Sequence, residues 1–171
     1  MRHTPSALSF TLILALALTF AGCAHYRLGP GNTPAYHTIY FAPVVNHSFA
    51  PQINTYVSDA LFRAFAQGGG MAVAGQNDGA EVVLHVTVTD FKKMIGATQS
   101  TDTGEARSLV MALKATATLS DPAGKQIYTG NFEVQQEYYA DSGLVRAEQE
   151  ALPQLADLLG QKIYRAVVSK W

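Results

Sequence analysis

A single cysteine, a near-neutral charge and the lack of a long apolar run restrict what this chain of 171 residues can be. One thiol cannot form an internal disulfide, so no disulfide framework is expected. A formal net charge of -1 lacks the marked basic excess of nucleic-acid-binding proteins, so no nucleic-acid partner is expected. The uncharged apolar stretch at residues 7–20 is shorter than the ~20 residues that a membrane-spanning helix needs.

Signatures of catalysis and of metal binding are also missing. The five histidines, at positions 3, 25, 37, 47 and 85, have no helical ligand spacing, and no second cysteine completes a zinc site. The glycines at 68–70 lack the Lys-Ser/Thr of a phosphate-binding loop, and no G-x-S-x-G motif occurs. Glu148 and Glu150 are two apart on an expected helix, so they do not face each other and are interpreted as solvated. The sequence therefore predicts no enzyme, no cofactor and no metal site.

The first residues have the layout of a bacterial secretory signal. Arg2 and His3 form a polar start, the apolar stretch at 7–20 follows, and small residues precede Cys23. We therefore predict that residues 1–22 are a signal peptide and that cleavage makes Cys23 the first residue of the mature protein.

Cys23 is the predicted lipidation site. The segment Phe20-Ala21-Gly22-Cys23 resembles the bacterial lipobox, in which the thiol is acylated before cleavage, although Phe20 departs from the usual aliphatic residue. The resemblance implies two or three acyl chains, palmitate among them, and two chains already anchor a protein stably. Ala24 replaces the aspartate associated with inner-membrane retention, so the outer membrane is expected. The alternative is an ordinary secreted protein with a chance cysteine at its cleavage site.

The rest of the chain is interpreted as a tether and one domain. Residues 23–35 include a stretch rich in glycine and proline and predict a short lipidated tether, and residues 36–171 predict a single domain. Within the domain, β-branched and aromatic residues or a period of two predict strands. The expected strands are 36–45, 81–91, 108–119 and 126–138, with a short edge strand at 71–74.

Two further segments have helical spacing. The first follows Pro51, which suits a first helical turn, and ends at the glycines 68–70. The second covers residues 144–168, where Pro153 is expected to kink or restart the helix. Each element has one apolar face, so we predict an α+β, two-layer sandwich. Two helices pack on one face of a mostly antiparallel four-stranded sheet in this arrangement.

In their order and spacing, several segments of the mature chain resemble the LPS-assembly lipoprotein LptE family. The matching segments are GCAHYRLG at 22–29, TIYFAPVVN at 38–46, GAEVVL at 79–84, the turn DPAGK at 121–125 and EQEAL at 148–152. The resemblance implies a function without catalysis. Family members sit in the lumen of the outer-membrane β-barrel LptD, plug it, assist its folding and help to deliver lipopolysaccharide to the cell surface.

For this chain the resemblance implies a lipid-anchored protein of the outer membrane that faces the periplasm or the barrel lumen. LptD and lipopolysaccharide are the implied partners. Basic side chains near strand ends are the family's suggested contacts with the anionic lipopolysaccharide. The candidates here are Lys92 and Lys93, expected to close one strand, and Arg107, expected to open the next, on either side of a polar loop at 96–105. The alternative is that these are ordinary solvated charges.

A different function class fits the same features. Lipoprotein regulators of peptidoglycan synthases share the lipobox, a flexible tether and a small α/β domain with an asparagine near the first helix. The tether here is short for reaching the cell wall. An unrecognised hydrolase is a third hypothesis, for which no residue pattern argues.

Overall fold

The computed structural model describes residues 35–98, 106–139 and 143–169, all of which belong to the unit Asn32–Trp171. The predictions made for residues 1–34, including the lipid on Cys23, lie outside the described residues. The elements are β1 (Thr38–Phe41), β2 (Val45–Asn46), α2 (Ile53–Gly68), β3 (Ala72–Val73), the 3₁₀ turn η2 (Asn77–Gly79), β4 (Val82–Thr98), β5 (Ala106–Ser120), β6 (Gln126–Tyr139) and α3 (Leu144–Val168). In the described part of the chain, no helix combines the length and the apolar character needed to cross a membrane.

The strands form one mixed sheet of six, in the order β3-β1-β4-β5-β6, with β2 also paired to β4. The long strands β4, β5 and β6 form an antiparallel meander, whereas β1, β2 and β3 run parallel to their neighbours. The expected α+β class with two helices is confirmed, whereas the sheet is mixed and has six strands in place of a mostly antiparallel four.

The expected strand 36–45 contains both β1 and β2, but the sequence pattern shows neither the break between them nor their parallel direction. β1 has four residues and β2 and β3 have two each, too few to display an alternation. The chain passes from β1 through α2 to β3, and parallel neighbours require such a crossover connection. The edge strand expected at 71–74 is confirmed as β3, which lies at the end of the strand order.

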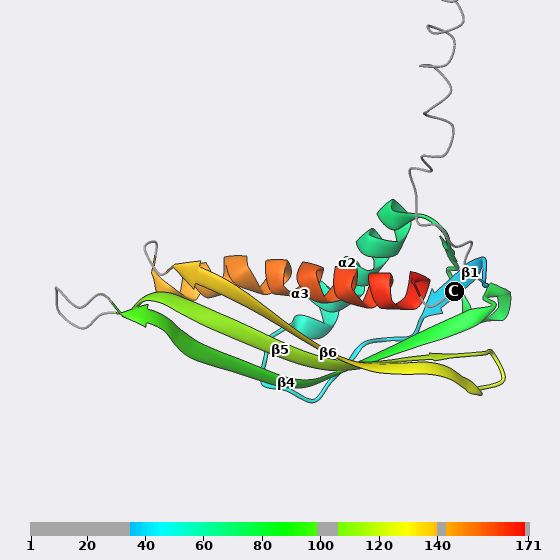
Figure 1. Cartoon of the computed structure of the whole chain (residues 1–171), viewed down its shortest axis with the longest axis horizontal. Helices are drawn as coiled ribbons and strands as arrows, with labels where there is room; N and C mark the ends of the chain where they lie inside the picture. The colour runs from blue at the N-terminus through cyan, green and yellow to red at the C-terminus, as the bar shows by residue number, and fades with distance from the viewer. Residues whose placement is uncertain (1–34, 99–105, 140–142, 170–171) are drawn as a thin grey trace, which may run out of the picture. The chain divides into compact units, whose positions relative to one another are not determined.

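Both helices cover the same face of the sheet, as the sequence predicts (Figure 1). In α2 the residues Ile53, Val57, Leu61 and Phe65 are fully or almost fully buried, which confirms the expected apolar stripe. The helix begins two residues after Pro51, because Gln52 has a left-handed backbone with φ of 54°. Pro51 therefore precedes α2 and does not occupy its first turn.

The bounds of α3 are those that the sequence predicts, but Pro153 does not restart the helix. Proline removes one backbone hydrogen bond and crowds the preceding turn. Leu152 and Leu155 are buried on either side of it, and packing of this kind holds most helices in place. Leu144 and Leu158 also fall at apolar positions of the helical spacing of residues 144–168, but both are exposed.

A register shift in β4 separates the sheet into two parts. Up to Val88, the even-numbered residues of β4 face the helices and are buried. The pairing with β5 then shifts between Val88 and Asp90. Beyond the shift Phe91 and Lys93 pair with Leu113 and Met111, which lie on the helix side of β5. One inserted residue thus exchanges the faces of all later side chains. The strand expected to end at residue 91 continues to Thr98.

Candidate functional site

The candidate basic residues lie in the part of the sheet beyond the register shift, which we call the distal sheet. It consists of residues 90–98 of β4, 106–114 of β5 and 133–139 of β6. β1 and β2 pair with β4 no further than Val88, so the distal sheet has three strands. It extends toward the β4–β5 hairpin, at the end of the sheet opposite β1 (Figure 1).

Lys92 and Lys93 do not close a strand as expected but lie in the middle of β4. Neighbouring residues of a strand point to opposite faces, so the two ammonium groups cannot form one patch on one face. Lys92 Nζ lies 3.3 Å from Asp90 Oδ2 on the face turned away from the helices, whereas Lys93 Nζ lies 2.7 Å from Glu148 Oε2 of α3. Each lysine thus has a carboxylate partner within the molecule.

Lys93, Glu148 and Tyr138 join β4, α3 and β6 in one polar cluster. Glu148 accepts a hydrogen bond from Lys93 and, at 3.4 Å, from the hydroxyl of Tyr138. The expectation that Glu148 is simply solvated is therefore wrong. Loss of solvation raises the pKa of Tyr138, and the negative charge of Glu148 raises it further. The cluster fixes the first turns of α3 to the distal sheet.

Arg107 lies near the start of β5, as the sequence predicts, but its side chain is outside the described part of the structure. The expected loop at 96–105 is shorter than predicted, since β4 includes residues 96–98. Residues 99–105 lie outside the described residues.

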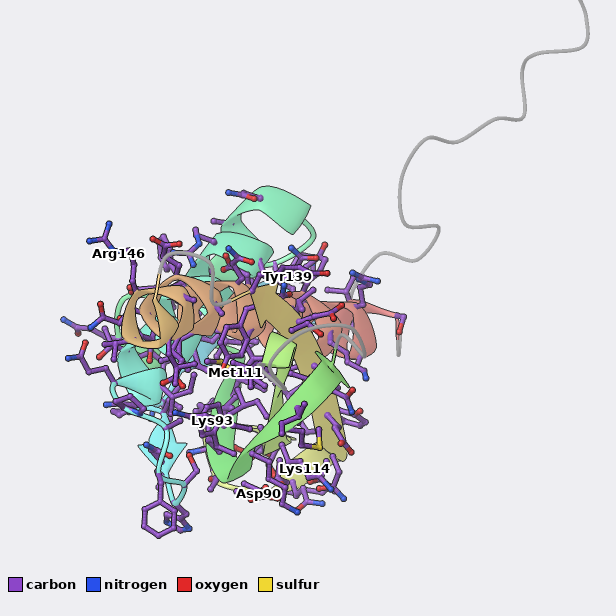
Figure 2. The ribbon with its side chains drawn as sticks, turned by 90° about the vertical axis from the view of Figure 1, so that its left-hand side faces the viewer. Asp90, Lys93, Met111, Lys114, Tyr139 and Arg146 are labelled. Carbon is purple, nitrogen blue, oxygen red and sulfur yellow. The ribbon has the colours of Figure 1, made fainter. Side chains whose placement is uncertain are left out.

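The face of the sheet that turns away from the helices is mostly polar. Lys114 Nζ lies 3.5 Å from Glu133 Oε2, Thr116 donates to Asn131 Oδ1 at 2.9 Å, and the hydroxyls of Thr118 and Thr129 are 3.1 Å apart. Figure 2 shows Asp90 and Lys114 on this side, whereas Met111 points toward α3. Because these charged and polar groups already pair across the strands, water or a polar partner can cover this face without leaving a charge buried and unpaired.

Exposed apolar side chains lie on and around the distal sheet, where the sequence pattern does not predict an apolar surface. Met94 and Ile95 come from β4, Tyr139 from β6, and Leu144 and Val145 from the first turn of α3. Their sequence signal was available: Leu144 and Val145 precede the buried stripe of α3, and Met94 and Ile95 follow a pair of lysines. A shallow pocket of about 250 Å³ lies nearby between β6 and α3, lined by Tyr138, Tyr139 and Glu150 among others.

Comparison with known proteins identifies the family. A model described as "LptE: Lipopolysaccharide-assembly" matches residues 36–167, most of the chain. The chain belongs to the LptE family. No curated protein sequence matches it. Membership supports a role in lipopolysaccharide assembly and places the chain in a family of lipoproteins that are not enzymes.

Solved structures share the fold of this LptE-family chain. Lipoprotein B from Nitrosomonas europaea is 18% identical, with a TM-score of 0.59, and the alignment covers 85% of this chain and 90% of that one. Protein XCC0632 from Xanthomonas campestris is 14% identical, with a TM-score of 0.55 and coverage of 84% and 92%. At these identities the likeness concerns the fold alone.

Proposed function

We propose that this protein is an outer-membrane lipoprotein, held by a lipid on Cys23, that occupies the lumen of the LptD barrel and supports its assembly. It also assists delivery of lipopolysaccharide to the cell surface and faces the periplasm or the barrel lumen. The match of residues 36–167 to the LptE family carries this proposal. No finding supports regulation of a peptidoglycan synthase.

The surface chemistry of the sheet supports a place inside a barrel. The lumen of a large outer-membrane barrel is polar and contains water. The open face of the sheet offers hydroxyl, amide and paired charged groups at Thr116, Asn131 and Lys114, which suit such surroundings. A lipid anchor in the same membrane raises the effective concentration of the domain near the barrel.

Co-purification tests the barrel partner. A tagged chain is extracted from outer membranes with mild detergent and captured, and the eluate is probed for LptD. A second outer-membrane lipoprotein with the same tag is the control for non-specific capture. We expect LptD in the first eluate alone, and we expect depletion of the protein to lower the amount of folded LptD. Recovery of the protein without LptD, with LptD abundance unchanged on depletion, would contradict the proposal.

We further propose that Lys92, Lys93 and Arg107 contact the anionic groups of lipopolysaccharide. Of the three, Lys92 is the best candidate, since its side chain is 61% exposed on the face that turns away from the helices. The test compares K92A and R107A with K125A, which removes one positive charge from the β5–β6 turn at the other end of the sheet. We expect weaker lipopolysaccharide binding for the first two variants. If all three variants bind lipopolysaccharide equally well, Lys92 and Arg107 are ordinary solvated charges and not contacts.

A further inference from the structure

The outer edge of β4 changes its surroundings abruptly at Val88. Before that point the edge is covered by β1 and then β2, and both run parallel to β4. The last backbone hydrogen bond on this edge runs from His47 N–H to the carbonyl of Val88, at 2.9 Å. The chain then turns toward α2, and β4 continues through residues 90–98 with β5 as its partner.

Beyond the register shift, every second residue of β4 points its backbone N–H and C=O groups out of this edge, away from β5. Leu84 and Val88 face the helices, and their carbonyls accept hydrogen bonds from the β1/β2 side. Along a strand of L-residues, side chains alternate between the two faces, and backbone N–H and C=O groups alternate between the two edges. All residues that face the helices therefore point their backbone groups to the same edge. After the shift the helix-facing residues are Phe91, Lys93 and Ile95, so their N–H and C=O groups point away from β5.

The opposite edge of the sheet, on β6, differs from the edge of β4 because side chains bond to its outward backbone groups. On β6 the outward carbonyl of Glu133 accepts a hydrogen bond from Lys162 Nζ at 2.8 Å, and that of Glu137 accepts one from Gln136 Nε2 at 2.9 Å. Natural sheets commonly block an exposed edge against pairing with another strand. Among the described residues, no side chain makes such a bond to the edge of β4 between Phe91 and Ile95.

The side chains beside this edge are apolar or already neutralised. Met94 is 43% exposed on one face and Ile95 is 66% exposed on the other. The two lysines have carboxylate partners, so the edge offers little unpaired charge to a ligand. Phe49, two residues after His47, is fully exposed.

A hydrogen-bonded turn holds Phe49 out from the protein. Asn46 Oδ1 accepts from the backbone N–H of Ser48 at 2.8 Å, and Asn46 Nδ2 donates to the carbonyl of Ala50 at 3.1 Å. Because these bonds order the backbone around Phe49, a partner that covers the ring does not also have to order the loop.

We propose that the edge of β4 from Phe91 to Ile95 binds an extended, largely uncharged segment of the barrel partner as an additional strand of the sheet. The added strand continues the row that β1 and β2 begin, and its backbone pairs with the outward groups of β4. Apolar side chains of the segment contact Met94 and Ile95, and Phe49 anchors its end near Val88. The inference rests on the proposed function, because it takes the barrel as the source of the segment.

Hydrogen–deuterium exchange of the purified protein–barrel complex and of the free protein tests this proposal. We expect amides in residues 91–95 to exchange about tenfold more slowly in the complex, since pairing protects the outward N–H groups. A peptide from the capped edge of β6, residues 131–137, is the internal control for a general change in exchange. Unchanged exchange at 91–95 in a complex that does form overturns this inference and leaves the proposed function standing. Failure of the complex to form overturns both.

A matched pair of variants tests the role of the backbone. I95P removes an outward N–H from the edge of β4, and Q135P removes the equivalent outward group from β6, where proline should be tolerated in the same way. Both must first melt as the unaltered protein does. We expect I95P to recover at least about fivefold less barrel than Q135P, because it blocks strand addition. Equal recovery by two folded variants contradicts the proposal. Protection at 91–95 that rises with concentration of the free protein would instead assign the edge to a second copy.

Discussion

At Gly160 the two helices approach so closely that a side chain has no room. A Cβ atom there would lie 2.9 Å from the backbone carbonyl carbon and oxygen of Ala60, atoms that cannot move without shifting α2. We expect G160A to lower the free energy of unfolding by about 1–3 kcal/mol, the usual cost of overpacking. Urea denaturation followed by circular dichroism measures the change.

The control for this substitution is G75A, because a Cβ atom at Gly75 meets no atom within 4 Å. G75A should leave the free energy of unfolding within a few tenths of a kcal/mol of the unaltered protein. If G160A is as stable as G75A, the close helix approach does not contribute to stability.

Tyr164 closes the end of α2 from the other helix. Its hydroxyl donates to the carbonyl of Gly68 at 2.7 Å, and its ring meets the ring of Phe65 edge-on with centroids 5.0 Å apart. Y164F keeps the ring contact and removes the hydrogen bond, so we expect a loss of about 0.5–1.5 kcal/mol in the free energy of unfolding. Y164A, which removes both, should be clearly less stable in the same denaturation experiment. Equal stability of Y164F and the unaltered protein would show that water replaces the hydroxyl at Gly68.

The partners of individual residues explain why the candidate site could be predicted only in part from the sequence. The sequence marks Lys93 as basic and near the end of an alternating pattern, but its partner Glu148 is 55 positions away along the chain. Only the packing of α3 on the sheet brings the two together. Lys92 was equally visible in the sequence and lies on the opposite face, because the register shift decides which of the two points toward the helix.

Among the elements, prediction succeeded where the pattern was long and unbroken. The helix α3, with 25 residues, carries an apolar stripe, and its bounds were predicted to the residue despite Pro153. The strand β4 was cut short because its apolar positions change from even to odd numbers at the bulge, which looks like the end of a strand. The positions of β1, β2 and β3 were predicted, but their parallel pairing was not, because it depends on contacts between residues distant in sequence.

The contact between α3 and β6 should depend on pH through Tyr138. Its pKa is raised in the folded protein, first by loss of solvation and then by Glu148, so the unfolded chain releases the phenolic proton more readily. Stability from this group is present below the ordinary tyrosine pKa of about 10 and falls as pH rises above it. We expect the free energy of unfolding to fall more for the unaltered protein than for Y138F between about pH 9 and about pH 11. If the free energy of unfolding falls equally for both proteins, ionisation of Tyr138 is not the cause of the fall.

For the whole molecule, the proposed lipid on Cys23 would keep the domain at the membrane that holds its proposed barrel partner. The described chain enters β1 at the end of the sheet opposite the distal sheet (Figure 1). The open edge of β4 lies in the distal sheet, at the other end of the sheet from the start of the described chain.

Substitution of the single cysteine tests the anchor directly. In cells fed an alkyne analogue of palmitate, we expect the unaltered protein to carry the label and C23S to carry none, because no other thiol is available for acylation. A24S keeps the cysteine and should label normally, which controls for disturbance of the cleavage site. Without its acyl chains C23S should also support less folded LptD, since the domain loses the high local concentration that the shared membrane provides. Label on C23S would place the acyl chains on another residue, and no label on the unaltered protein would contradict a lipid anchor.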